Sequence, residues 1–325
     1  MNGIICELCP RACSLKPGQV GVCGARIADA QRVIPLNHGC LSAVHVDPIE
    51  KKPLYHFYPG CRALSLGGFG CNLMCRGCQN ASISRARADY CSDGFCMLPQ
   101  DIVAHAQKYA CPVIAYTYNE PIVWHEFACE TAQAAREAGI KNIMVTAGYV
   151  TANMREKIFS HMDAANVDLK GFTETFYRSW AKAELAPVLE TIEYLHQLPG
   201  FWLELTTLLI PGQNDAQADL EAEFSWIAER LGTDIPIHLS AFHPAWQAKE
   251  IPATPIETLE KALKLAKEAG LHHVYLGNVP LSSDTVCPKC GQLLISRWGY
   301  HTEIRGLKNG KCSACDSQLA GVLAH

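Results

Sequence analysis

Residues 67–80 read Gly-Gly-Phe-Gly-Cys-Asn-Leu-Met-Cys-Arg-Gly-Cys-Gln-Asn, and this stretch decides how the rest of the chain is interpreted. Cys71, Cys75 and Cys78 supply three thiolates within eight residues. Soft thiolates are the donors that iron–sulfur clusters require, and the glycines between them allow tight backbone turns around such a cluster. Three local cysteines leave one iron of a four-iron cluster without a protein ligand, and the expected chemistry depends on that open iron.

The composition indicates a folded protein with a sizeable core. Of the 325 residues, 49% are hydrophobic and 18% are charged, which fits one large domain with appendages or two domains. The formal net charge of -4 does not predict a nucleic-acid binder. No apolar run reaches the length of a membrane span, and the N-terminus lacks the features of a signal peptide. We therefore expect a cytoplasmic protein with neither nucleic acid nor membrane as a partner.

Seventeen cysteines are an unusual number, and in a reducing compartment they indicate metal ligation rather than disulfides. Near the C-terminus, two C-x2-C pairs have the spacing of a zinc ribbon, formed by Cys287, Cys290, Cys312 and Cys315. A rubredoxin-like iron or a second cluster is the alternative. A module this short has too little core to fold unaided, so the metal would supply its folding energy.

A further group of four cysteines lies near the N-terminus, at Cys6, Cys9, Cys13 and Cys23. Its spacing fits both zinc and an auxiliary iron–sulfur cluster. The third interpretation is a reduced, cysteine-rich loop without metal. The sequence therefore predicts a second metal site here without deciding between these metals.

The chain divides into three zones: a cysteine-rich N-terminal region over residues 1–60, a core over 61–282 and a zinc-ribbon-like tail over 283–325. The core alternates apolar runs with amphipathic stretches, which predicts an α/β fold with a parallel sheet, either a barrel or an open one. Strands are expected at 62–68, 113–118, 141–146, 165–170, 201–210, 235–240 and 273–276, and helices at 122–138, 187–197, 220–231 and 256–269. The chemistry of such folds lies at the carboxyl ends of the strands.

The motif Cys-x3-Cys-x2-Cys after the first strand of a βα series resembles the radical SAM superfamily. The resemblance implies a partial (β/α)6 TIM-like barrel and a [4Fe–4S] cluster whose open iron is chelated by S-adenosylmethionine (SAM). It further implies reductive cleavage of SAM to a 5′-deoxyadenosyl radical that abstracts hydrogen from a substrate, with an external electron donor of the flavodoxin or ferredoxin type. A zinc loop is the alternative, but no fourth ligand of obvious spacing follows Cys78.

Polar motifs after the later strands resemble the pyruvate formate-lyase activating enzyme branch of that superfamily. They are Tyr-Thr-Tyr-Asn-Glu-Pro at 116–121, Asp-Leu-Lys-Gly at 168–171 and Ser-Ala-Phe-His-Pro at 240–244. Carried over by position, the expected SAM-binding residues are Glu120, Asp168, Lys170 and His243. A lysine can pair with a carboxylate, and an aspartate can accept from a hydroxyl or an ammonium. The alternatives are a surface charge for Lys170 and a bond to a loop carbonyl for His243.

The flanking segments 6–26, 46–57 and 287–300 look like those of the radical SAM member of the AmmeMemoRadiSam system. This resemblance implies Memo-like and AMMECR-like partner proteins and leaves the substrate open. The polar segment 47–58 is expected either to contact the active site, which we favour, or to form a solvated turn.

Three functions are weighed. The first is an enzyme that generates a radical for an unidentified substrate, which can be a small molecule or a lipid precursor. The second is an activase that acts on a glycyl-radical enzyme as its protein partner. The third is a metal-binding scaffold without turnover, against which the polar residues at the strand ends speak.

Overall fold

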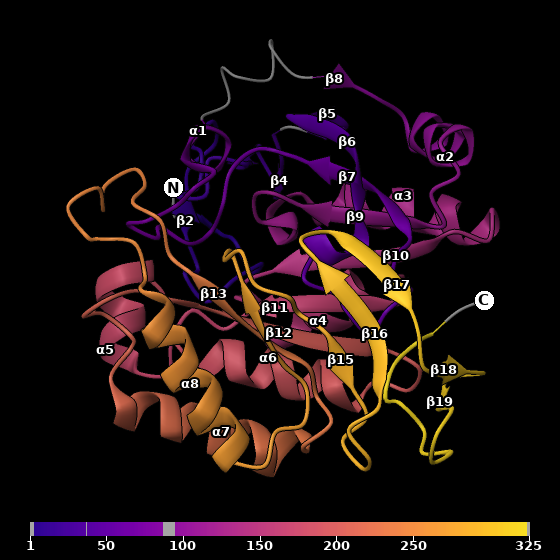
Figure 1. The fold of residues 1–325 in the computed structure, drawn as a ribbon. Helices are drawn as coiled ribbons and strands as arrows, with labels where there is room; N and C mark the ends of the chain where they lie inside the picture. Colours follow the sequence, from indigo (N-terminus) through magenta and orange to yellow (C-terminus); the bar gives the residue numbers. More distant parts are fainter. Residues whose placement is uncertain (1–2, 37, 87–94, 324–325) are drawn as a thin grey trace.

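The computed structural model describes residues 3–36, 38–86 and 95–323. Its centre is an eight-stranded sheet with the order β14-β13-β12-β11-β10-β9-β7-β6 (Figure 1). The strands are β6 (Ala43–Pro48), β7 (Arg62–Gly67), β9 (Val113–Thr117), β10 (Lys141–Thr146), β11 (Ala164–Asp168), β12 (Trp202–Leu209), β13 (Ile237–Ala241) and β14 (Val274–Gly277). All are parallel except β6, which pairs antiparallel with β7 at the sheet edge. The predicted α/β fold with a central parallel sheet is confirmed, and the closure into a partial barrel stays a prediction.

Helices connect successive strands, as parallel pairing requires. The longer ones are α2 (Pro99–Lys108), α3 (His125–Glu137), α4 (Ala152–Phe159), α6 (Ala186–Gln197), α7 (Gln217–Leu231) and α8 (Ile256–Glu268). Helices α6, α7 and α8 lie side by side along one side of the molecule (Figure 1). No helix in the described part of the chain is both long and apolar enough to cross a membrane.

Short elements complete the fold around the cluster motif and the N-terminus. The helical ones are η1 (Ile49–Lys51), α1 (Ala81–Ser84), η3 (Pro121–Trp124), α5 (Glu174–Phe176) and the π-helix η4 (Tyr177–Ala181). The strands are β1 (Ile4–Ile5), β2 (Ser14–Leu15), β3 (Arg26–Ala28), β4 (Val33–Pro35), β5 (Cys40–Leu41) and β8 (Phe95–Cys96). They pair as three small antiparallel ribbons outside the main sheet.

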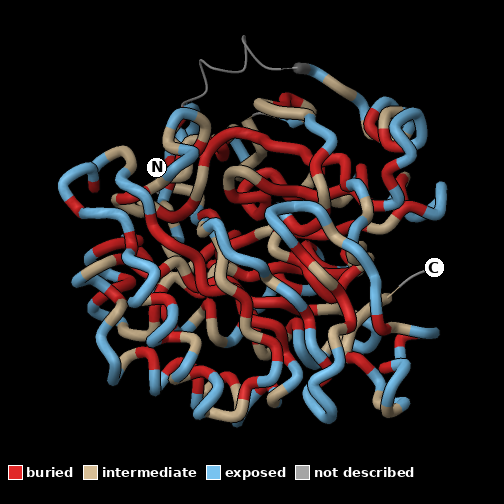
Figure 2. The backbone as a smooth tube through the Cα atoms, viewed as in Figure 1, coloured by how far each residue is buried: buried red, intermediate tan, exposed pale blue. Residues whose placement is uncertain are grey.

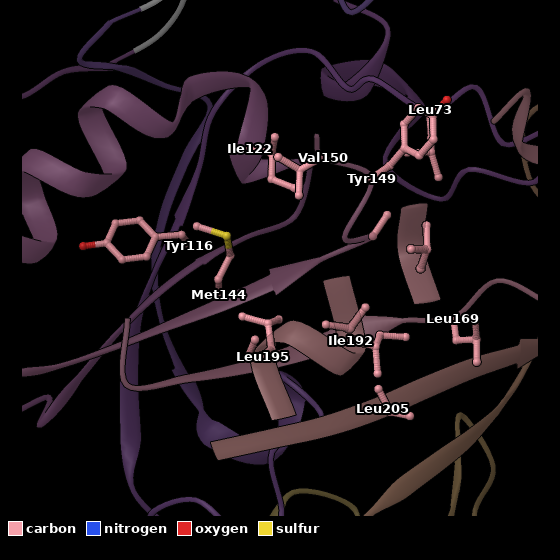
Figure 3. Close-up of a cluster of buried hydrophobic side chains, with 14 of the residues drawn as sticks. Leu73, Tyr116, Ile122, Met144, Tyr149, Val150, Leu169, Ile192, Leu195 and Leu205 are labelled. Carbon is pink, nitrogen blue, oxygen red and sulfur yellow. The ribbon is translucent and has the colours of Figure 1, made fainter. Parts of the chain in front are cut away.

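The central strands are buried on both faces (Figure 2), and all five residues of β9 are buried. One face packs under the helices through a large apolar cluster that includes Tyr116, Met144 and Leu205. Figure 3 shows part of this cluster, with Leu73 of the cysteine motif beside Tyr149. The loop of the motif is therefore anchored in the same core as the sheet.

The segment 49–58 covers the amino ends of the strands. Ile49, Leu54 and Phe57 form a second buried cluster with residues that begin strands, among them Ala63 and Val113. The apolar side chains of this segment therefore pack at the end of the sheet opposite the carboxyl ends of the strands, a position that the sequence did not indicate.

Two polar residues of this region, Asp47 and Lys52, contact the side chain of Tyr118, which follows β9. The Asp47 carboxylate accepts from Tyr118 Oη at 2.5 Å and from Lys52 Nζ at 2.7 Å. Lys52 Nζ also lies 4.4 Å from the centre of the Tyr118 ring. Tyr118 belongs to the motif that follows β9, so this part of the expected contact is present.

The C-terminal residues form a small module of their own. It contains β15 (Thr285–Val286), β16 (Leu293–Trp298), β17 (His301–Ile304), β18 (Leu307–Lys308) and β19 (Lys311–Cys312), drawn in yellow in Figure 1. Arg297 is 1% exposed and fixes the module to the segment 49–58 by donating to Tyr55 O at 2.6 Å. Glu204, on β12, accepts from the Tyr55 and His56 amides at 2.9 and 2.7 Å.

Candidate metal centres and the strand-end site

The loop that carries Cys71, Cys75 and Cys78 connects β7 to α1 and is packed tightly by two other segments. Gly70 has φ +83°, and a Cβ there would lie 2.4 Å from the carbonyl oxygen of Cys23. A Cβ on Gly77 would lie 2.7 Å from the ring of Phe242, which belongs to the motif after β13. Real Cβ atoms do not approach other atoms this closely, so both positions require glycine.

Asn119 braces the same loop from the end of β9. Its Oδ1 accepts from Gly68 N at 2.9 Å, and its Nδ2 donates to Gly70 O at 2.8 Å. Tyr118 has φ 69°, a conformation that favours glycine. Asn119 thus holds the loop through its side-chain amide, a role that the sequence did not reveal.

Burial raises the pKa of both Cys71 and Cys75 well above the usual thiol value. The charges of Lys170 and Arg85 act on Cys75 in the opposite direction, which shows that both cations lie near its sulfur. Arg85 also donates to the carbonyl oxygen of Cys71 at 3.3 Å. A thiolate in this place therefore needs a bound cation or metal to be stable. Arg85 gave no signal in the sequence beyond being a cation near the motif.

Glu120 is 3% exposed and is held by the end of β10. Its carboxylate accepts from Thr146 Oγ1 at 2.6 Å, from Ala147 N at 2.8 Å and from Ile122 N at 3.2 Å. Burial raises the pKa of Glu120, and these bonds act against the increase. A carboxylate can accept about four hydrogen bonds, so one acceptor direction is left for a ligand.

Asp168 and Lys170 form an ion pair of 2.9 Å at the end of β11. Burial alone would lower the pKa of Lys170, but the charges of Asp168 and Cys75 raise it above the usual lysine value. Cys75, Asp168 and Lys170 therefore lie close together, although the sequence separates the motifs by about 90 residues. Both side chains of the pair remain partly exposed, at 31% and 24%, which leaves them accessible to a ligand.

Asn214 holds this strand end in place and was missed by sequence reasoning. Its Nδ2 donates to Lys170 O at 2.8 Å and to Leu208 O at 2.9 Å, and its Oδ1 accepts from Ile210 N at 2.7 Å. It thereby joins the loops after β11 and β12. Asp215, next to it, accepts from Gly212 N at 2.8 Å and is a turn residue.

His243 follows β13 and is exposed. The structure places it two residues beyond the last residue of that strand, at the same edge of the sheet as Glu120 and Lys170. Its neighbour Phe242 is buried and packs against Gly77, so the backbone around His243 is fixed to the cluster loop.

The four C-terminal cysteines have the geometry of a single-ion site. Cys287 Sγ lies 3.6 Å from Cys315 Sγ, and Cys290 Sγ lies 3.6 Å from Cys312 Sγ. Tetrahedral Zn–S bonds of about 2.3 Å put neighbouring sulfurs about 3.8 Å apart. In the described residues, these four are the one group of at least three Cys, His, Asp or Glu side chains with all ligand atoms within 4.8 Å of one another.

Among the described residues, neither of the other two cysteine groups is this compact. Their sulfur atoms are therefore more widely spaced than the ligands of a single ion. A four-iron cube binds each thiolate through a different iron, so its ligands stand farther apart than those of one zinc ion. Cys71, Cys75 and Cys78 therefore fit a cluster better than zinc.

Burial also raises the pKa of two N-terminal thiols, to about 11 for Cys9 and in the same direction for Cys23. Cys6 and Cys9 are 9% and 7% exposed. All four N-terminal cysteines surround one cavity, which Asn72 of the cluster loop also lines. The predicted second cysteine group is thus brought together in space and placed against the first.

The fold and the cysteine motif define a radical SAM protein. Residues 66–224 match the family described as "Radical SAM superfamily", and the chain belongs to that superfamily. Over 326 aligned residues, the chain is 41% identical to an uncharacterized protein of Methanocaldococcus jannaschii, covering 99% of this chain and 96% of that one.

Solved structures match this chain at low identity. A radical SAM methyltransferase from Sphaerobacter thermophilus matches with a TM-score of 0.53 and 15% identity, over 73% of this chain and 71% of that one. A domain of pyruvate-formate lyase-activating enzyme from Bacteroides vulgatus matches with a TM-score of 0.45 and 16% identity, over 50% of this chain and 98% of that one. The methyltransferase supports the α/β radical SAM fold and says nothing of the substrate.

Proposed function

We propose that this protein is an enzyme that cleaves SAM reductively at a [4Fe–4S] cluster held by Cys71, Cys75 and Cys78. When bound, the cluster and SAM supply a one-electron cleavage to methionine and a 5′-deoxyadenosyl radical, which takes a hydrogen atom from an unidentified substrate. The electron would come from a donor of the flavodoxin or ferredoxin type. One observation carries the proposal: Lys170, paired with Asp168, lies beside Cys75 at the edge of the sheet where Glu120 is buried.

The residues of this chain have distinct roles in the proposal. Lys170 would pair with the carboxylate of SAM, and Asp168 would accept from its ammonium or a ribose hydroxyl. Glu120 fixes the turn after β10 through Thr146 and Ala147 and would offer its last acceptor direction to the ammonium. His243, exposed after β13, would contact the nucleoside part of SAM.

An anaerobic assay for 5′-deoxyadenosine tests this proposal. The purified chain is reconstituted with iron and sulfide, and dithionite and SAM are added. We expect product from the natural sequence and background from Cys75→Ala. Cys129→Ala, a thiol on α3 outside every cysteine group, is the matched control and should keep the full yield. A yield equal to that of Cys75→Ala would refute the enzymatic function.

Lys170→Met separates SAM binding from cluster binding. We expect an unchanged iron content, because Lys170 is not a metal ligand, but a loss of the shift that SAM causes in the EPR spectrum of the reduced cluster. The exposed Lys182→Met is the control for loss of a lysine charge. A normal SAM-dependent shift in Lys170→Met would remove Lys170 from the binding site.

Two kinds of substrate are considered. One is a small molecule or lipid precursor, and the other is a glycyl-radical enzyme as protein partner. The polar residues at the strand ends support an enzyme and not a metal-binding scaffold, because a scaffold needs no ion pair beside a buried thiol. Transfer of deuterium from a labelled candidate into 5′-deoxyadenosine identifies the substrate, and label from a partner protein would establish an activase.

For the C-terminal module we propose zinc bound by Cys287, Cys290, Cys312 and Cys315 as a zinc ribbon. The sulfur spacing of 3.6 Å across both pairs supports it. In the full chain, Cys290→Ala combined with Cys315→Ala should lose the zinc and leave the iron content unchanged. Unchanged zinc would refute this site.

We further propose that the core at 61–282 forms the partial (β/α)6 barrel and that the chain acts in the cytoplasm with Memo-like and AMMECR-like partners. The support is the resemblance of the segments 6–26, 46–57 and 287–300 to the AmmeMemoRadiSam member. Co-purification of tagged chain with candidate partners from the same cell tests it, and recovery of neither partner would argue against membership.

A further inference from the structure

Residues 3–26 fold around one space beside the cluster loop. This space is lined by four thiols, those of Cys6, Cys9, Cys13 and Cys23. Two guanidinium groups, of Arg11 and Arg26, and the amide of Asn72 complete its polar lining. The proposed cleavage of SAM uses none of these four cysteines, so the function of this site is open.

The backbone holds the four cysteines in a fixed arrangement. Cys6 N donates to Cys13 O at 2.9 Å, and Ala12 N donates to Cys9 O at 3.1 Å. The carbonyl of Cys23 accepts from Cys71 N at 3.0 Å, which ties this group directly to the loop of the first cluster. The site is therefore formed by the folded chain and does not depend on a flexible tail.

The spacing of the sulfurs argues for a cluster over a single ion. Zinc would draw four sulfurs to about 3.8 Å from one another, as the C-terminal cysteines show at 3.6 Å. The N-terminal cysteines share a cavity but do not belong to any group within 4.8 Å in the described part of the chain. Four thiolates on four different irons meet this wider spacing.

The polar lining suits a group with negative charge and sulfur acceptors. Four thiolates give a four-iron cluster a net negative charge, which cations nearby stabilise. Arg11 and Arg26 supply two guanidinium groups, although Arg26 is also paired with Glu126 at 2.7 Å. Arg26 Nε, which is a hydrogen-bond donor, is buried without a partner. Asn72 also contacts the Cys9 thiol.

We infer that Cys6, Cys9, Cys13 and Cys23 ligate a second [4Fe–4S] cluster, packed against the loop of Cys71, Cys75 and Cys78. With four cysteines, every iron has a protein ligand, so this cluster has no open iron to chelate SAM. The two clusters therefore differ in chemistry although they are neighbours in space.

The test removes the first cluster and counts what is left. The full chain with Cys71→Ala, Cys75→Ala and Cys78→Ala is purified anaerobically and reconstituted with iron and sulfide. We expect about four irons and about four sulfides per chain, with Mössbauer parameters of a [4Fe–4S] cluster and an EPR signal that SAM does not change. Adding Cys6→Ala and Cys9→Ala to this variant should remove the iron and leave the C-terminal zinc.

Two controls keep the outcome decisive. Cys61→Ala with Cys129→Ala, in the same triple background, should keep all the iron. The EPR spectrum of the natural sequence should resolve two reduced clusters, of which SAM perturbs one, so the answer does not depend on whether the N-terminal variant folds. No iron in the triple variant, or zinc rising to about two per chain, would overturn the inference. Neither readout requires SAM cleavage, so the proposed function can fail or hold independently.

Discussion

Asn119 and Tyr118 show how single residues position the loop of the first cluster. Tyr118 holds a φ of 69° through its bonds to Asp47 and its contact with Lys52, which offset strain of about 1 kcal/mol or more. This strained turn presents the Asn119 amide to both Gly68 and Gly70. The Asn119 side chain thus fixes the loop by hydrogen-bonding to the backbone of both Gly68 and Gly70.

Asn119→Ala should weaken the first cluster without unfolding the protein. The change leaves the Gly68 amide and the Gly70 carbonyl without their partner, and loss of groups that orient metal ligands typically costs about 10–100-fold in affinity or activity. We expect 5′-deoxyadenosine formation to fall by about that factor, with faster loss of iron to a chelator. Asn153→Ala, exposed on α4, is the control and should behave as the natural sequence. Equal iron retention in both variants would contradict the bracing role.

At the scale of elements, the contact between the N-terminal loop and the cluster loop is the tightest feature of the site. Gly70 combines a positive φ with a carbonyl oxygen 2.4 Å from where its Cβ would be. Gly139, which ends α3, has φ +74° and nothing within 4 Å of that position. The two glycines therefore separate the effect of backbone conformation from the effect of packing.

Gly139→Ala should lower the free energy of unfolding by about 1 kcal/mol, the usual penalty for a left-handed alanine. Gly70→Ala should lower it by a further 1–3 kcal/mol or so, because overpacking adds to the same backbone penalty. Urea unfolding of both variants measures the difference. If the two variants lose the same free energy, the contact between Cys23 and Gly70 does not contribute.

The sequence predicted regular elements well where the apolar pattern decides them. The expected strand 141–146 and the helix 256–269 agree with β10 and α8 to within one residue, because buried parallel strands and amphipathic helices have clear patterns. Helix α4 was not predicted, since Ala152–Phe159 has little hydrophobic periodicity. Edge strand β6 was not predicted either, because His45 and Asp47 interrupt its apolar residues.

The candidate site also contains some residues that the sequence could predict and others that it could not. Residues of strand-end motifs could be listed from the sequence, because parallel strands bring their carboxyl ends to one edge. Asn119, Arg85 and Asn214 could not be assigned, since each acts on a segment that only the folded chain brings near. The contact of Cys23 with Cys71 is of this kind as well.

At the scale of the whole molecule, a buried polar network joins the sheet to the C-terminal module. Glu204 accepts from His238 at 2.7 Å and from two backbone amides, and its pKa is lowered by these partners despite burial. His56 donates from Nδ1 to Ala320 O at 2.6 Å, so its Nε2 accepts from Tyr275 at 2.6 Å. His56 is therefore neutral in the folded protein.

This network makes stability depend on pH. Burial lowers the pKa of His56 to about 4 from an ordinary 6.5, so the unfolded chain binds the proton first as pH falls. Stability is full above pH 6.5 and declines towards pH 4, by about 2 kcal/mol between pH 7.5 and 5 for this one group. The lowered pKa of Glu204 keeps its own contribution intact over that interval.

The free energy of urea unfolding, measured between pH 5 and 7.5, tests this dependence. His56→Asn should be less stable at every pH but should show a shallower decline, because one of the histidines whose pKa burial lowers is gone. His125 and His273, whose pKa values burial also lowers, keep their part of the decline. The exposed His196→Asn is the control and should keep the natural slope. An unchanged slope in His56→Asn would show that this histidine does not govern the pH response.

The attachment of the C-terminal module also has a consequence for biosynthesis. The partner of His56 at Ala320 lies 264 residues later in the chain, and Val322 pairs with both His56 and Tyr58. At roughly 5–20 residues per second, the ribosome needs about 13–53 seconds to make the intervening chain. Until the tail is made, the segment 49–58 lacks its contacts with Arg297, Ala320 and Val322. The nascent protein therefore completes the covering of the amino end of its sheet only after synthesis of the tail.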